Sequence, residues 1–172
     1  MTMIDNLILT INPGIFLILG GLISSILPLK IAQKFNIALP LLLLLGLWNT
    51  EQGNHFSVLF LGYNLELFRV DAFSYIFGII FLIAIAVANL YSIGANTGKI
   101  EPSASMIYAG SATAAVFAGD LITLFIFFEI AAISSVFLIW ARGTRRAFSA
   151  GFRYLIVQIG AGVILLSGIL IY

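Results

Sequence analysis

Charged residues divide the chain into long apolar stretches whose lengths approach that of a membrane-spanning helix. Such a helix needs about 20 mostly apolar residues, because the hydrocarbon core of a bilayer is about 30 Å thick. Pro40 lies near the start of the second stretch, where the first turns of a helix tolerate proline. We expect helical spans within residues 6–29, 35–50 (with a few preceding residues), 72–98, 102–119, 121–141 and 147–172.

Residues 51–70 follow a different pattern. Two segments rich in β-forming residues, 56–61 and 65–70, flank the turn-like sequence Gly62-Tyr63-Asn64. The second segment also alternates its side chains with a period of two, which is typical of a strand. We therefore expect an extramembrane β-hairpin between the second and third spans. The rest is predicted to be an all-α, polytopic transmembrane bundle that forms a single membrane domain over residues 1–172.

The composition supports a membrane protein. Of the 172 residues, 62% are apolar and 9% are charged, and the mean hydropathy is +1.15, whereas soluble domains carry about 25% charged residues. This excludes disorder and disfavours a soluble globule, because so few charges cannot cover a surface. A net charge of +1 without a basic stripe argues against nucleic acid as a partner.

Cofactor and metal chemistry find no support in the sequence. The chain has no cysteine, which removes disulfides, thiolate metal sites and thiol nucleophiles. The sequence also shows no metal-binding cluster, phosphate-binding loop or nucleophile motif. We expect no cofactor and no bound metal.

Positive charge predicts the orientation, because cytoplasmic loops of membrane proteins are enriched in Lys and Arg. With the N-terminus outside, Arg69 is the single basic residue on the outer side. The first residues carry Asp5 and no basic residue, so they lack the basic region of a secretory signal peptide. We predict a multi-pass protein of the cell inner (plasma) membrane. The cytoplasmic basic residues would be Lys30, Lys34, Lys99, Arg142, Arg145, Arg146 and Arg153.

Glu129 is the strongest candidate for chemistry. It lies eight residues into the fifth stretch, which places it about 12 Å deep at about 1.5 Å per residue. A carboxylate at the bilayer centre costs at least about 2.5–3.5 kcal/mol on insertion scales, so such residues face the protein interior or water and mark ion or proton pathways. The alternative is a structural carboxylate that pairs with Lys or Arg of a neighbouring helix.

Three further charged residues lie within or at the start of the apolar stretches. Arg153 lies about 9 Å into the sixth stretch. It either extends to the cytoplasmic surface or pairs inside the bundle, with Glu129 as the candidate partner. Asp120 begins the fifth stretch and is interpreted as a helix cap, with a role in outer-side proton exit as the alternative. Asp71 precedes the third stretch and has Ser74 three residues later, which predicts another cap.

Small residues recur at four-residue spacing in the fourth stretch. Helices in membranes approach closely along such rows, because small side chains let the backbones come together. The rows therefore predict packing rather than transport. They are Ser111, Ala115 and Gly119, and Gly110, Ala114 and Ala118.

Three segments resemble one family. Residues 115–130, AVFAGDLITLFIFFEI, are similar to the fifth span of antiporter-like subunits, with Ile122 and Thr123 as departures from the family pattern GDLFxLFxFFE. These subunits are the D subunit of Mrp-type sodium/proton antiporters and the homologous proton-pumping subunits of respiratory complex I. Gly151-Phe152-Arg153-Tyr154-Leu155 looks like the A-x-K/R-Y-L start of the sixth span, and residues 65–74 resemble the segment from the hairpin to the third span.

The resemblance implies a role for Glu129. It would be the span-five glutamate of the proton pathway, which in that family pairs electrostatically with a lysine on span seven. Proton transfer would then continue along further lysines and a histidine near mid-membrane. The chain would be a transporter-type subunit that translocates protons without carrying redox chemistry. The family's topology agrees with an outside N-terminus.

The sequence departs from the family in its extent. Family members continue well beyond a sixth span, so the span-seven lysine is absent here. We expect a split subunit, a truncated fragment, or a reduced paralogue that scaffolds a larger complex. The expected partners are other membrane subunits, including a chain that supplies the missing C-terminal spans, the lipid bilayer, and Na⁺ or H⁺ as transported ions. The alternatives are a structural subunit without an ion path, and a small homo-oligomeric transporter. A single intramembrane carboxylate and missing inverted repeats disfavour the latter.

Overall fold

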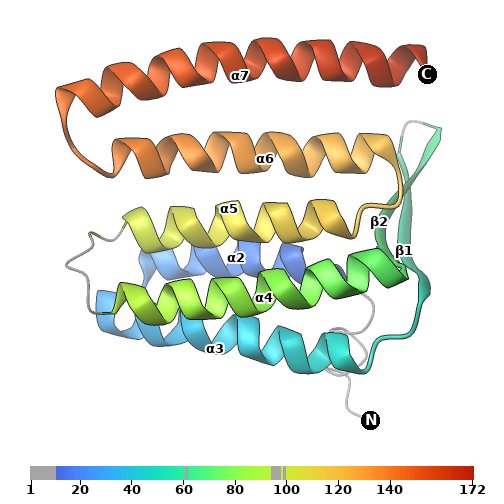
Figure 1. Ribbon diagram of the computed structural model, residues 1–172, viewed down its shortest axis with the longest axis horizontal. Helices are drawn as coiled ribbons and strands as arrows, with labels where there is room; N and C mark the ends of the chain where they lie inside the picture. The colour runs from blue at the N-terminus through green and yellow to red at the C-terminus, as the bar shows by residue number, and fades with distance from the viewer. Residues whose placement is uncertain (1–10, 61, 94–97, 99) are drawn as a thin grey trace.

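The computed structural model describes residues 11–60, 62–93, 98 and 100–172. Within this part the chain forms helices and one antiparallel two-stranded hairpin (Figure 1). The hairpin lies between the second and third described helices, as expected. The elements are α2 (Pro13–Ile26), α3 (Leu29–Trp48), β1 (Gly53–Phe60), β2 (Tyr63–Val70), α4 (Ala72–Ser92), α5 (Ile100–Val116), α6 (Leu121–Trp140) and α7 (Arg145–Ile171).

The described helices fall into two length classes. By length and composition, α3, α4, α6 and α7 are long and apolar enough to cross a membrane. The other two, α2 and α5, have 14 and 17 residues, which correspond to about 21 and 26 Å. Within the described residues, the six expected spans therefore correspond to six helices of unequal length in a polytopic membrane bundle. The beginning of the first expected stretch and the end of the third lie outside the described residues.

The second span begins earlier than expected. Pro28 is the N-cap of α3 and Leu27 before it is extended, because a residue that precedes proline is disfavoured in the helical region. The break between α2 and α3 is therefore short, and Lys30 and Lys34 lie in the first turns of α3 rather than in a loop. Pro40 lies inside α3, so its placement in the first turns was wrong. Membrane helices tolerate interior proline because neighbouring groups satisfy the freed carbonyl.

The hairpin turn is shorter than expected. Tyr63 and Asn64 belong to β2 and pair with Phe60 and Leu59 of β1, so they are not turn residues. Gly62 connects the strands with a φ of +87°, a conformation that glycine adopts without steric cost. Short connections with positive φ match the twist of paired strands, which explains why the strands extend closer to the turn.

The buried core lies among α2, α3, α4, α5 and β2. Its fully buried side chains include Leu17, Leu82, Met106, Phe68 and Phe117. α6 packs on α5, and α7 packs on α6 at the outside of the bundle (Figure 1). α7 is exposed along most of its length, and its buried residues are Ala147, Gly151 and Gly162.

α2 and α5 are in close contact because glycine faces backbone at their crossing. A Cβ added to Gly14 would collide with the carbonyl oxygen of Gly110 and the backbone nitrogen of Ala114, and would lie 2.6 Å from the Cα of Ala114. A Cβ added to Gly110 would lie 2.7 Å from the Cβ of Leu17. Gly110 and Ala114 belong to one of the predicted rows of small residues, which is thus a packing surface.

Gly14→Ala should lower the melting temperature by several degrees. The added methyl meets backbone atoms, which cannot move aside unless α2 separates from α5, and such overpacking costs about 1–3 kcal/mol. Gly168→Ala is the matched control, since its added Cβ meets no atom within 4 Å. Thermal unfolding of the purified protein in detergent measures both variants. Equal melting temperatures would contradict the close crossing of α2 and α5.

Candidate functional site

Charged side chains gather at the two ends of the bundle. The hairpin and the α5–α6 connection lie at one end, and the α2–α3 and α6–α7 connections lie at the other (Figure 1). Arg69 is the basic residue at the hairpin end among those described. Asp5 and Lys99 lie outside the described residues. The assignment of the basic end to the cytoplasm stays a prediction. That end carries Lys30, Lys34, Arg142, Arg145 and Arg146.

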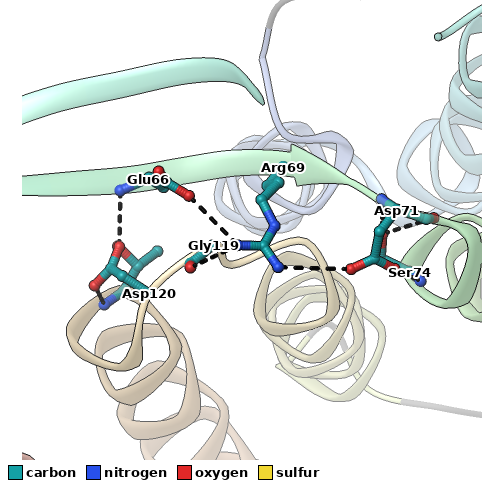
Figure 2. A network of polar contacts seen from close by, with 7 residues as sticks. Glu66, Arg69, Asp71, Ser74, Gly119 and Asp120 are labelled. Carbon is teal, nitrogen blue, oxygen red and sulfur yellow. Dashed lines mark hydrogen bonds and ion pairs between the residues drawn. The ribbon is translucent and has the colours of Figure 1, made fainter. Parts of the chain in front are cut away.

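At the hairpin end, polar contacts join β2 to the α5–α6 connection (Figure 2). The backbone N–H of Gly119 donates to the carbonyl of Glu66 at 2.8 Å, and that of Arg69 donates to the carbonyl of Phe117 at 2.9 Å. The Arg69 guanidinium lies 3.7 Å from the Glu66 carboxylate and 3.9 Å from that of Asp71. These contacts hold the hairpin against the end of the helix bundle.

Asp120 connects this network to α6. Its carboxylate accepts hydrogen bonds from the backbone N–H of Thr123 at 2.8 Å, the Thr123 hydroxyl at 2.5 Å and the backbone N–H of Glu66 at 2.7 Å. Asp120 is thus the N-cap of α6, and it also pairs a backbone donor of β2. Its geometry is that of a structural cap, and a part in proton exit stays a prediction.

Asp71 caps α4 in a reciprocal capping box. The backbone N–H of Ser74 donates to Asp71 Oδ1 at 2.8 Å, and the backbone N–H of Asp71 donates to Ser74 Oγ at 2.8 Å. The hydrogen bond from the Ser74 backbone, helped by the Ser74 hydroxyl and the positive charge of Arg69, holds the pKa of Asp71 below its usual value. The predicted cap is present.

Glu129 lies near the middle of α6, eight residues beyond its start at Leu121. The side chain is half-buried, and its Oε1 atom is buried without a hydrogen-bond partner in the part of the chain that the structure describes. The carboxylate packs against Gly162 of α7. A Cβ added at Gly162 would collide with Oε1 and would lie 3.0 Å from Cδ and 3.3 Å from Oε2 of Glu129. The carboxylate therefore occupies the space that a side chain at position 162 would fill.

Other contacts establish the antiparallel register of α6 and α7. Near the connection, Trp140 packs on Gly151, where an added Cβ would lie 2.8 Å from the indole Cδ1. Further along, the Ser135 hydroxyl donates to the Tyr154 hydroxyl at 2.9 Å. Residue 153 therefore lies at a level between Ser135 and Trp140, and the level of Glu129 is farther from the basic end.

Arg153 is not brought to Glu129. Their levels differ by six to eleven residues of α6, or about 9–16 Å at 1.5 Å per residue. Arg153 is exposed and contacts Ser149, with Nε 3.5 Å from the carbonyl and Nη2 3.5 Å from the hydroxyl. Of the two interpretations of Arg153, this geometry favours extension towards the basic end. Ion pairs among the described residues join Arg69 to Glu66 and to Asp71, and none joins Arg153 to Glu129.

A cavity of about 390 Å³ lies between α5, α6 and α7 beside this site. Tyr108, Tyr154 and Gln158 supply its polar lining, and Phe128 and Ala131 of α6 line it on either side of Glu129 in the sequence. These polar side chains and the open space lie next to the part of α6 that carries Glu129, whose own side chain is not among the lining residues. No group of three or more His, Cys, Asp or Glu residues in the described ranges could hold a metal ion.

Gly162 is the site residue that sequence reasoning missed. Gly160, Gly162 and Gly168 all occur in the last stretch, and their spacing does not show which of them faces Glu129. An added Cβ meets no atom within 4 Å at Gly160 or Gly168, whereas it meets the carboxylate at Gly162. The antiparallel register would have identified Gly162, but the register becomes visible only in the folded bundle.

Comparison with known proteins finds a described family model that matches the segment carrying this site. Residues 118–172 match the family model described as "NADH:quinone oxidoreductase/Mrp antiporter, TM". The matched segment contains Asp120, Glu129, Arg153 and Gly162. The match supports the superfamily that the sequence resembles, while assignment to one particular type of subunit within it stays a prediction.

A curated relative is similar over a limited length. The chain is 38% identical over 65 residues to an uncharacterized protein of Methanocaldococcus jannaschii. This match covers 38% of the chain and 14% of the relative. The chain therefore spans a small part of the length of the curated relative that it matches.

Protonation of Asp71 should lower the stability of the fold in acid. Since folding lowers the pKa of Asp71, the unfolded chain binds the proton more readily. The stabilisation is then fully present above the usual pKa of about 4 and is lost as the pH falls through the lowered value. The asparagine in Asp71→Asn does not titrate. Between about pH 5 and about pH 2, the melting temperature of this variant should therefore fall less than that of the parent protein.

The control is Glu51→Gln, at an exposed position before the hairpin, which should keep the parent's acid response. Thermal unfolding of the purified proteins over a pH series provides the comparison. An unchanged acid response in Asp71→Asn would show that this cap does not contribute to the pH dependence.

Proposed function

We propose that this chain supplies the N-terminal helices of a membrane subunit in a multisubunit monovalent cation/proton antiporter or a related proton-pumping respiratory complex. The observation that carries the proposal is Glu129, whose Oε1 is buried and unpaired in the described part of the chain. The residue lies at mid-helix in the segment that matches the antiporter family model. Ionisable groups at such depth are costly and mark ion or proton pathways.

In this proposal Glu129 takes and gives a proton, or changes the proton affinity of a neighbouring lysine through its charge. The described basic residues place no partner within ion-pair distance of its carboxylate. The lysine would therefore come from further spans, supplied by another chain or by more of this one. The cavity lined by Tyr108, Tyr154 and Gln158 supports polar access to this region of α6.

The exposed face of α7 supports a larger assembly. Few residues of this 27-residue helix are buried, so its outer face is free to contact either lipid or further helices. We propose that residues 1–172 form one membrane domain and pack against other membrane subunits. The domain would lie in the inner (plasma) membrane with the basic end cytoplasmic and the N-terminus outside. It would move protons, with Na⁺ or H⁺ as the transported ion, without carrying redox chemistry.

The competing function is a scaffold subunit without its own ion path. Packing of the Glu129 carboxylate on Gly162 is compatible with such a role, because a half-buried carboxylate can simply fill space between helices. The two functions differ in whether transport depends on the charge of Glu129.

Glu129→Gln should reduce proton-coupled transport by about tenfold or more, because the amide keeps the shape of the side chain but transfers no proton. The variant is measured in the assembled complex in native membrane vesicles, with assembly checked by co-purification of the other subunits. Glu51→Gln, exposed and outside the helices, is the control that also removes one carboxylate. Undiminished transport by an assembled Glu129→Gln complex would favour the scaffold.

Gly162→Ala should reduce transport while Gly160→Ala does not. The methyl at Gly162 occupies the space of the Glu129 carboxylate and displaces it, whereas an added Cβ at Gly160 meets no atom within 4 Å. Both changes replace glycine by alanine in α7, so their effects on helix propensity cancel in the comparison. Transport per assembled complex is the measurement. Equal transport by the two variants would show that the position of the carboxylate against α7 does not matter.

A further inference from the structure

A second unpaired polar group lies on the other side of the bundle, in α3. Asn36 is 1% exposed, and neither its Oδ1 nor its Nδ2 has a hydrogen-bond partner among the described residues. Buried side-chain amides in folded proteins are almost always hydrogen-bonded to protein or ordered water. This requirement is stricter in a membrane, where the hydrocarbon offers no hydrogen bonds.

Asn36 lies against a second buried amide. Nδ2 of Asn89, on α4, donates to the backbone carbonyl of Asn36 at 3.0 Å and lies 3.7 Å from the sulfur of Met106. Asn89 is 6% exposed. It precedes the last residue of α4 by three positions, and Asn36 follows the first residue of α3 by seven. The pair therefore lies within about 10 Å of the basic end of these helices.

A crevice at that end reaches Asn89 of the amide pair, and Asn36 is not among its lining residues. It has a volume of about 230 Å³ and lies between α4, α5 and α6, with Asn89 in its lining. Ser92, the last residue of α4, and Glu101, in the first turn of α5, line it near the helix ends, and Ser105 lines it one turn deeper. A crevice of this size has room for several water molecules, since each occupies about 30 Å³ in the liquid.

We propose that this crevice is an aqueous inlet that opens at the basic end, that water in it binds the amide of Asn89, and that water continues past Asn89 to the buried amide of Asn36. Water accepts from Nδ2 and donates to Oδ1, so it satisfies both unpaired atoms of Asn36. The lining combines apolar residues with hydroxyl, carboxylate and amide groups, and these polar groups can hydrogen-bond water. Glu101 is the charged residue in the lining, so inside the crevice its carboxylate favours cations over anions, against the positive field of the basic residues at this end.

The inlet is independent of the function proposed for Glu129. The crevice lies between α4 and α5, with Leu138 of α6 as one wall, whereas the Glu129 carboxylate faces Gly162 of α7. If the crevice proves dry, the proposal for Glu129 is unaffected. If transport does not depend on Glu129, the proposal for the inlet is unaffected.

Cysteine accessibility tests the inlet directly, because the chain contains no cysteine. Single variants Asn89→Cys and Ser105→Cys are made in the full chain and treated in membrane vesicles with a water-soluble, cationic methanethiosulfonate. Ala104→Cys is the depth-matched control, since Ala104 neighbours Ser105 on α5, is 5% exposed and does not line the crevice. Exposed Arg146, at the basic end, is changed to Cys to report which side the reagent reaches.

We expect both crevice cysteines to react at least tenfold faster than Ala104→Cys, and only from the side that labels Arg146→Cys. Ser105→Cys is a conservative change, so it serves where Asn89→Cys does not fold. Reaction no faster than that of Ala104→Cys overturns the inlet. Reaction with lipid-soluble thiol reagents alone also overturns it, because the crevice would then hold lipid.

Two companion variants test the charge and the amide. Glu101→Gln should slow the reaction of the cationic reagent with Ser105→Cys severalfold. It should not slow the reaction of an anionic methanethiosulfonate with the same cysteine. Equal slowing of both reactions overturns the cation preference. Asn36→Leu should lower the melting temperature by several degrees if Asn36 binds water. If the site is dry, removing an unpaired amide leaves the melting temperature unchanged or raises it, which overturns the bound water.

Discussion

Hydrocarbon offers no hydrogen bonds, so every polar group within the bilayer must be satisfied by protein or by admitted water. The arrangement of this molecule follows from that requirement. The spanning backbone is helical, and the strands lie at one end, where Asp71 and Asp120 cap α4 and α6. Among the described residues, buried side-chain atoms without a partner occur at Asn36 and Glu129. A costly, unsatisfied group persists where it has a use, and our proposals therefore concern these two residues.

Close packing depends on small residues for the same reason. Lipid tails are as apolar as leucine, so helices in a membrane gain little from burying apolar side chains and associate through close backbone contact. Gly14 and Gly110 bring α2 and α5 together backbone to backbone. Gly162 uses the same absence of a side chain differently, because its space receives the Glu129 carboxylate. Glycine therefore positions both the scaffold and the candidate site.

The hairpin connects the segment outside the family match to the segment within it. Residues 118–172 carry the match, and they begin at the connection that β2 holds through Glu66 and Arg69. Asp120 contacts both segments, because it caps α6 and its carboxylate accepts a hydrogen bond from the backbone of β2. The start of α6, and with it the position of Glu129 along the bundle, is thus held by contacts from a distant part of the sequence.

Local features were predictable from the sequence. Charge spacing located the helices apart from the start of α3, and Asp71 with Ser74 predicted a cap. The apolar sequence around Glu129 placed this residue at mid-helix. These features were predictable because helix ends and apolar spans depend on residues that are close in the sequence. Only the tertiary structure decided that Gly162 faces Glu129, that Arg153 does not, and that Asn36 meets Asn89. These outcomes depend on the register between helices, which arises from packing along whole helix faces and leaves no short-range signal in the chain.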